Sequence, residues 1–119
     1  MMENLLDKEN INKTIGTDPN LQKKIISLYL RDAPKLLNEV EEAAKNGDNK
    51  KMGENSHALK GITGYYNTGD VYNMCLKLEQ LGKANAMPEK NAEITDSLSQ
   101  LKNFISRLLE ELKIYVEQI

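Results

Sequence analysis

The sequence predicts an all-α protein, an antiparallel four-helix bundle in up-down-up-down order with a short extra N-terminal helix. Apolar residues recur at spacings of three and four along several segments, which is the period of an amphipathic helix. Runs of β-branched residues are few and there are three prolines, a composition that favours helices over strands. The 119 residues suffice for one modest core, so we expect a single domain spanning residues 1–119.

The first two expected helices precede Gly47. Residues 5–15 form a short, weakly patterned segment. Asp18 and Pro19 then mark a helix start, because aspartate accepts hydrogen bonds from free backbone N–H groups and proline suits the first helical position. The apolar pattern continues to Ala44. We expect a kink or a break near residues 31–33, because Pro34 removes a backbone donor.

Gly47 and Asp48 should end the second helix and begin the third. Glycine tolerates the left-handed conformation at a helix end, and Asp48 can cap the helix that follows. The third helix should cover residues 49–66, and residues 67–69 read as a turn. A fourth helix should then end near residues 84–87. Its apolar residues are Val71, Met74, Cys75, Leu78 and Leu81.

The last helix has the clearest pattern and should open at Pro88 and Glu89. Its apolar residues alternate steps of four and three, which makes a seam for packing against other helices. Such a seam also suits an intermolecular coiled coil, but the other amphipathic segments favour packing within one chain. The seam consists of Ile94, Leu98, Leu101, Ile105, Leu108, Leu112, Tyr115 and Ile119.

Composition excludes several classes of protein. The net charge of −2 and the pI of about 5.5 lack the basic character of a nucleic-acid binder. No apolar run is long enough to span a membrane, and the N-terminus does not resemble a signal peptide. One histidine and one cysteine do not make a metal site, and Cys75 reads as a buried apolar residue. We therefore expect a cytoplasmic monomer.

The one histidine, His57, should project into solvent. On an ideal helix at about 100° per residue, the apolar residues of its segment lie on the opposite face. This geometry turns the imidazole away from the core, where a partner could reach it. The opposite face holds Met52, Leu59, Ile62 and Tyr66.

Three glycines lie within about 40° of His57 on the same ideal helix, at positions 53, 61 and 64. A glycine inside a helix costs about 0.5–1 kcal/mol relative to alanine, so three on one stripe require a reason. We interpret Gly53, Gly61 and Gly64 as clearance for a bulky group that must approach the imidazole. Lys60 lies on the same side, at about −60°.

A nucleophile, a cation and cleared space indicate phosphoryl chemistry. A solvent-exposed imidazole is largely neutral at pH 7 and is a competent nucleophile toward phosphorus. The ammonium of Lys60 could neutralise phosphoryl oxygens. These groups suffice for an in-line exchange of a phosphoryl group with a partner that brings Mg²⁺ and an acceptor carboxylate. A surface histidine beside a lysine can equally have no function, and helix geometry alone leaves that alternative open.

Residues 57–61, His-Ala-Leu-Lys-Gly, resemble the H-x-L-K-G signature of histidine phosphotransfer (HPt) domains. The run at residues 28–34 is similar to the second helix of that family, and Gly47-Asp48 to the turn before its histidine helix. The resemblance covers residues 18–83, and the last helix is compatible in pattern only. Cys75, Leu78 and Glu79 stand where the family often has Cys, Leu and Glu or Gln.

Residues 61–64 are not a phosphate-cradling loop, because no strand precedes them and no Gly-Lys-Ser/Thr run follows, so we expect no ATP site. The resemblance implies a phosphocarrier without turnover of its own. His57 would be phosphorylated at Nε2, Lys60 would stabilise the phosphoryl oxygens and Gly61 would give a docking partner room. Lys83 would be the basic residue that some members place on the adjacent helix. Tyr65 could flank the docking surface or cap the bundle end. The partners would be response-regulator receiver domains and a hybrid sensor histidine kinase, with Mg²⁺ on the receiver and no cofactor bound here.

Two features depart from the family pattern. Asn67 stands where glycine is usual, and we expect it to adopt the left-handed conformation that asparagine tolerates next best. Ile62 and Thr63 stand where residues are often small, which predicts altered packing. Two alternatives stay open: a helical module that binds a receiver or another partner without carrying phosphate, and an enzyme acting on phosphate esters.

Overall fold

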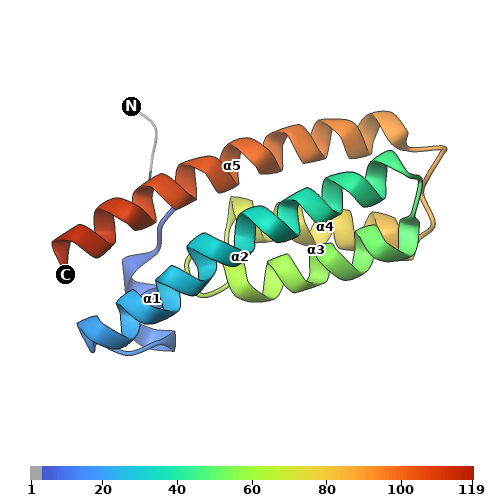
Figure 1. The fold of residues 1–119 in the computed structure, drawn as a ribbon. Coiled ribbons are helices and arrows are strands. Elements are labelled where there is room, and N and C mark those ends of the chain that lie inside the picture. Colours follow the sequence, from blue (N-terminus) through green and yellow to red (C-terminus); the bar gives the residue numbers. More distant parts are fainter. Residues whose placement is uncertain (1–3) are drawn as a thin grey trace.

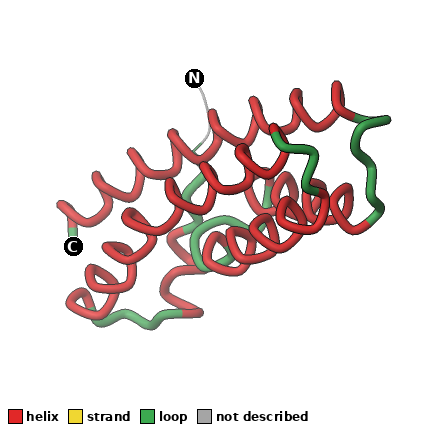
Figure 2. The backbone as a smooth tube through the Cα atoms, turned by 45° about the vertical axis from the view of Figure 1, so that its right-hand side comes forward, coloured by secondary structure: helices red, strands yellow, loops and turns green. Residues whose placement is uncertain are grey.

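A computed structural model describes residues 4–119, which form five helices (Figure 1). Helices α2 to α5 alternate in direction and build an antiparallel bundle, with no strand among the described residues (Figures 1 and 2). The predicted all-α bundle with a short extra N-terminal helix is confirmed. The helices are α1 (Lys8–Thr14), α2 (Pro19–Lys45), α3 (Asn49–Thr63), α4 (Asp70–Lys83) and α5 (Asn91–Gln118).

The four long helices surround an aliphatic core. Helix α3 packs between α2 and α4, and α5 closes the ring by packing against α4 and α2. The predicted seam of α5 is buried except at Ile119, so it faces this chain's own bundle. No described helix is long and apolar enough to cross a bilayer. Large side chains at the centre include Ile26, Met52, Leu59, Leu78, Leu101 and Leu108.

Helix ends follow the predicted signals at two of the turns. The side chain of Asp18 accepts a hydrogen bond from the Asn20 backbone N–H at 3.0 Å, which caps α2. Asp48 caps α3 in the same way through Lys51, also at 3.0 Å. Gly47 between α2 and α3 has a φ of +69°, a conformation that costs glycine little. The predicted caps and turn are confirmed.

Helix α2 continues through Pro34, so of the kink or break expected near residues 31–33 the break was wrong, and the kink stays a prediction. Pro34 is exposed, and its neighbours on the core side, Ala33 and Leu37, are buried. The ring therefore lies on the water-facing side, where solvent can satisfy the carbonyl that loses its partner. Burial of the opposite stripe holds the helix together across the proline.

Two other boundaries differ from the prediction. Helix α3 ends at Thr63, three residues before Tyr66, and α5 begins at Asn91 rather than at Pro88. Beyond α3 the chain turns, and the Tyr66 N–H donates to the Thr63 carbonyl at 2.9 Å. The turn still buries the Tyr66 ring, which lies 4.7 Å from the ring of Tyr29. Tyr66 thus belongs to the core without belonging to the helix.

Asn67 acts through its side chain and not through a left-handed backbone. Among the described residues the only non-glycine residue with positive φ is Asn85, so the expected conformation of Asn67 was wrong. Its Oδ1 accepts from the backbone N–H groups of Gly69, Val71 and Tyr72 at 3.0 to 3.4 Å. Its Nδ2 donates to the Leu5 carbonyl at 2.7 Å. The amide thus caps α4 and ties down the N-terminal segment, which glycine could not do.

Candidate functional site

His57 lies in the middle of α3 and projects outward. Its side chain is 66 % exposed, which confirms the outward direction worked out from the helical period. Met52 and Leu59, on the opposite face of α3, have no solvent exposure. Their burial against the rest of the bundle fixes the rotation of α3 about its axis and so keeps the imidazole in water.

Glu79 of α4 lies beside the imidazole. Its Oε2 is 3.0 Å from Nδ1 of His57, and its side chain is only 4 % exposed. Sequence reasoning did not include Glu79 among the site residues. The one available signal was its place in the family resemblance. The helical period relates only residues of the same helix, and Glu79 lies 22 positions from His57 on another helix.

The Glu79 carboxylate is neutralised by two lysines. Nζ of Lys60 lies 2.7 Å from Oε1, and Nζ of Lys83 lies 2.7 Å from Oε2. Burial by itself would raise the pKa of Glu79, but hydrogen bonds from Lys60, Lys83 and His57 outweigh it and lower that pKa to about 2. The hydrogen bond to Glu79 in turn raises the pKa of Lys60 above its ordinary value. Glu79 is therefore an anion throughout the physiological range.

An ionised Glu79 determines how the imidazole is protonated. A carboxylate can only accept hydrogen bonds, so the nitrogen that faces it, Nδ1 of His57, must carry the proton. In the neutral ring the other nitrogen, Nε2, then holds the free lone pair. Nε2 has no hydrogen-bond partner among residues 4–119. The arrangement presents a nucleophilic nitrogen to solvent in one tautomer.

Gly53 contacts α4 and also lines a hollow beside His57, and the clearance for a docking partner stays a prediction. It is buried where α3 crosses α4, and a Cβ there would lie 3.4 Å from the Glu79 carbonyl oxygen. Opposite it, a Cβ on Gly82 would lie 2.6 Å from the Gly53 nitrogen. A Cβ on Gly53 would make ordinary contact, whereas one on Gly82 would clash, so it is Gly82 that lets α3 and α4 approach closely and brings Glu79 to His57. The helical period placed Gly53 near His57 but could not say that α4 covers that side.

The other two predicted clearance glycines differ from each other. Gly61 is exposed, and a Cβ there would meet nothing within 4 Å. Gly64 is half-buried, and a Cβ there would lie 3.5 Å from the ring of Tyr72. Tyr65 is 42 % exposed at the end of α3. Gly61 is thus the glycine with open space around it, and the roles of Gly61 and Tyr65 in docking stay predictions.

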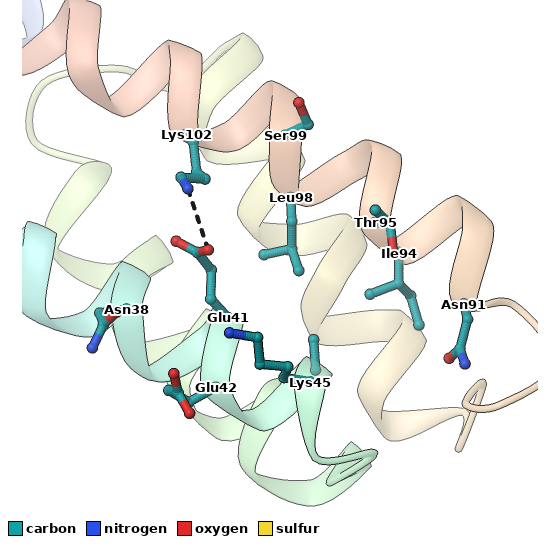
Figure 3. A pocket seen from close by; sticks show the side chains of 11 residues that line it. Asn38, Glu41, Glu42, Lys45, Asn91, Ile94, Thr95, Leu98, Ser99 and Lys102 are labelled. Carbon is teal, nitrogen blue, oxygen red and sulfur yellow. Dashed lines mark hydrogen bonds and ion pairs between the residues drawn. The ribbon is translucent and has the colours of Figure 1, made fainter.

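A hollow of about 700 Å³ adjoins His57 between the start of α3 and the end of α4, and Lys50, Gly53, Lys83 and Asn85 are among its lining residues. A second hollow, of about 470 Å³, lies between α2 and α5. Figure 3 shows that hollow and the ion pair across it, in which Nζ of Lys102 lies 3.3 Å from Glu41. No residue of α3 or α4 lines it, so it is separate from the imidazole.

Cys75 is buried in the core below the site, as predicted. Its burial raises the pKa of its thiol to about 12, so the thiolate that would react or bind a metal is scarce. Within residues 4–119, His, Cys, Asp and Glu side chains do not gather in a group of three or more that could hold a metal ion.

Comparisons with known proteins identify the family and the fold of this chain. The model of the Hpt domain family matches residues 24–113. The crystal structure of histidine-containing phosphotransfer protein B (HptB) from Pseudomonas aeruginosa PAO1 is similar over 97 % of this chain and 96 % of that chain, with a TM-score of 0.83. The identity is 13 %, so this likeness concerns the fold. A search of curated proteins found no match. Because the family model covers more than half of the sequence, including His57 and Glu79, the chain belongs to the Hpt domain family.

Proposed function

We propose that the chain carries a phosphoryl group on Nε2 of His57 between receiver-domain aspartates of a phosphorelay. The observation that carries this proposal is the bond between Nδ1 of His57 and the buried carboxylate of Glu79, at 3.0 Å. It leaves Nε2 as the nitrogen with the lone pair on a side chain that is mostly in water. Membership of the Hpt family supports the same reading.

The step balances with the groups that this chain supplies. Nε2 attacks the phosphorus of an aspartyl phosphate, the P–O bond to the aspartate breaks, and its electron pair goes to the leaving carboxylate. The ring becomes cationic and keeps its proton on Nδ1, where the Glu79 carboxylate stabilises the new charge. The reverse step regenerates the neutral ring and an aspartyl phosphate. Both phosphorylated species are high in energy, so transfer proceeds in either direction.

The partner completes the site. The receiver contributes the aspartate and the Mg²⁺ that neutralises the transferring group. In this chain, Glu79 orients the imidazole of His57, and the two lysines balance the charge of the Glu79 carboxylate. Gly61, with open space around it, lets the receiver surface approach α3. We propose receiver domains and a hybrid sensor kinase in the cytoplasm as partners, and a monomer as the acting form.

Transfer from a receiver tests the proposal. The chain is incubated with Mg²⁺ and a receiver domain labelled through acetyl phosphate, next to a His57→Gln variant of matched helicity. We expect label on the wild type only, lost in acid and kept in alkali, as phosphohistidine chemistry requires. Equal labelling of both proteins would refute the assignment of His57. A receiver that binds both proteins equally and labels neither would favour the binding module without phosphate.

A further inference from the structure

The two lysines that hold Glu79 differ in their surroundings. Lys60 pairs with Oε1 and its side chain is 15 % exposed, whereas Lys83 pairs with Oε2 and is 69 % exposed. The Lys60 ammonium also lies 5.9 Å from the centre of the Tyr72 ring. Lys60 is thus enclosed between the carboxylate and an aromatic ring, and Lys83 is open to solvent.

Lys83 and His57 share one carboxylate oxygen and one hollow. Nδ1 of His57 and Nζ of Lys83 both contact Oε2 of Glu79, at 3.0 and 2.7 Å. Both residues line the hollow beside α3, and Lys60 does not. A phosphoryl group on the imidazole that faces this hollow therefore has the Lys83 ammonium within its reach.

We propose that Lys60 is a positioning residue, which neutralises the buried Glu79, and that Lys83 is the ammonium that turns to the phosphoryl oxygens of phosphorylated His57. The inference rests on the proposed function. It also reverses the roles that the sequence motif suggested, in which Lys60 contacts the phosphoryl group and Lys83 supports it.

The charges explain why one lysine can leave Glu79 and the other cannot. Phosphorylation makes the His57 ring cationic, so Oε2 keeps a charged donor even after Lys83 departs. The Lys83 side chain is 69 % exposed, so water can solvate its ammonium when it leaves Glu79. Oε1 has Lys60 as its ion-pair partner, and removing the partner of a buried carboxylate is strongly unfavourable. The phosphoryl group therefore recruits Lys83 while Lys60 stays in place.

Nitrogen NMR of the lysine ammonium groups tests the division directly. The chain is phosphorylated on His57 with phosphoramidate, and the Nζ signals are assigned with Lys60→Met, Lys83→Met and Lys77→Met. Lys77 is the matched control, because it lies on α4 too and pairs with Glu93 away from the imidazole. We expect the Lys83 signal to move on phosphorylation and the Lys60 signal to move no more than that of Lys77. Movement of Lys60 with a stationary Lys83 would overturn the inference.

Two further measurements separate this inference from the proposed function. Lys60→Met should raise the pKa of Glu79 more than Lys83→Met does, and the opposite order would refute the positioning role even if His57 never took up phosphate. With a receiver as donor, Lys83→Met should lower the equilibrium constant for transfer to His57 about tenfold, the usual effect of losing one charge-assisted hydrogen bond. Lys83→Arg should recover most of it. An unchanged constant in Lys83→Met would refute its phosphoryl-binding role, whereas absence of any label on His57 would refute the proposed function.

Discussion

Replacing Gly82 by alanine tests whether the close crossing of α3 and α4 creates the site. The new Cβ would lie 2.6 Å from the Gly53 nitrogen, 2.7 Å from the Asn49 oxygen and 2.8 Å from the Gly53 Cα. These atoms belong to the backbone of α3, so no side chain can turn away. The shortest contact falls about 0.8 Å below the 3.4 Å at which ordinary contact begins. The two helices must therefore move apart.

The magnitude follows from two opposing terms. Overpacking of this kind costs about 1–3 kcal/mol, and alanine in a helix regains up to about 1 kcal/mol relative to glycine. We expect the free energy of unfolding of Gly82→Ala to fall by about 1.5 kcal/mol, the middle of the resulting range of about 0–3 kcal/mol, measured by urea denaturation. Separation of the helices should also lengthen the 3.0 Å contact between His57 and Glu79, which the nitrogen NMR shifts of the imidazole report.

Gly61→Ala is the matched control, because the same substitution there meets nothing within 4 Å. It should stabilise the fold by about 0.5–1 kcal/mol, leave the imidazole shifts unchanged and slow transfer from a receiver. The reasoning is refuted if Gly82→Ala is as stable as the wild type with unaltered imidazole shifts. It also fails if Gly61→Ala, and not Gly82→Ala, disturbs the ring.

Three further predictions concern Glu79, Asn67 and Cys75. The pKa of Glu79 in the folded chain, about 2, lies below its ordinary value of 4.5, so the contribution of this carboxylate to stability is complete above about pH 5 and is lost as the pH falls toward 2. Urea denaturation across that range should show the free energies of unfolding of wild type and Glu79→Gln converging at low pH, and a constant difference would contradict this. Asn67→Gly should lower the free energy of unfolding by about 1–2 kcal/mol, because it removes the side-chain hydrogen bonds to the start of α4 and to Leu5. Asn67→Asp, which keeps the acceptor, should lose less, and equal losses would assign the effect to the bond with Leu5. The Cys75 thiol should react with a thiol reagent only at the rate of global unfolding, and rapid reaction of the native chain would show that its burial is incomplete.

Much of the fold could be predicted because the signals are local. The alternating seam of α5, the caps at Asp18 and Asp48 and the glycine at the α2–α3 turn each act within a few residues of chain. The errors arose where burial overrides local preference. Pro34 remains inside α2 because the opposite stripe of that helix is buried, and Tyr66 joins the core from a turn because its ring packs against Tyr29.

For the site, the sequence by itself determined that His57 faces solvent, because the period of one helix relates His57 to the apolar stripe on its own helix. Tertiary structure decided what stands beside it. Gly53 and Gly61 lie at similar angles from His57, yet one touches α4 and the other touches nothing. The partnership with Glu79, across 22 residues of sequence, exists because Gly82 on α4 allows α3 and α4 to meet closely. Such contacts depend on which neighbouring helix covers each face of α3. The apolar period of one helix contains no information about its neighbours.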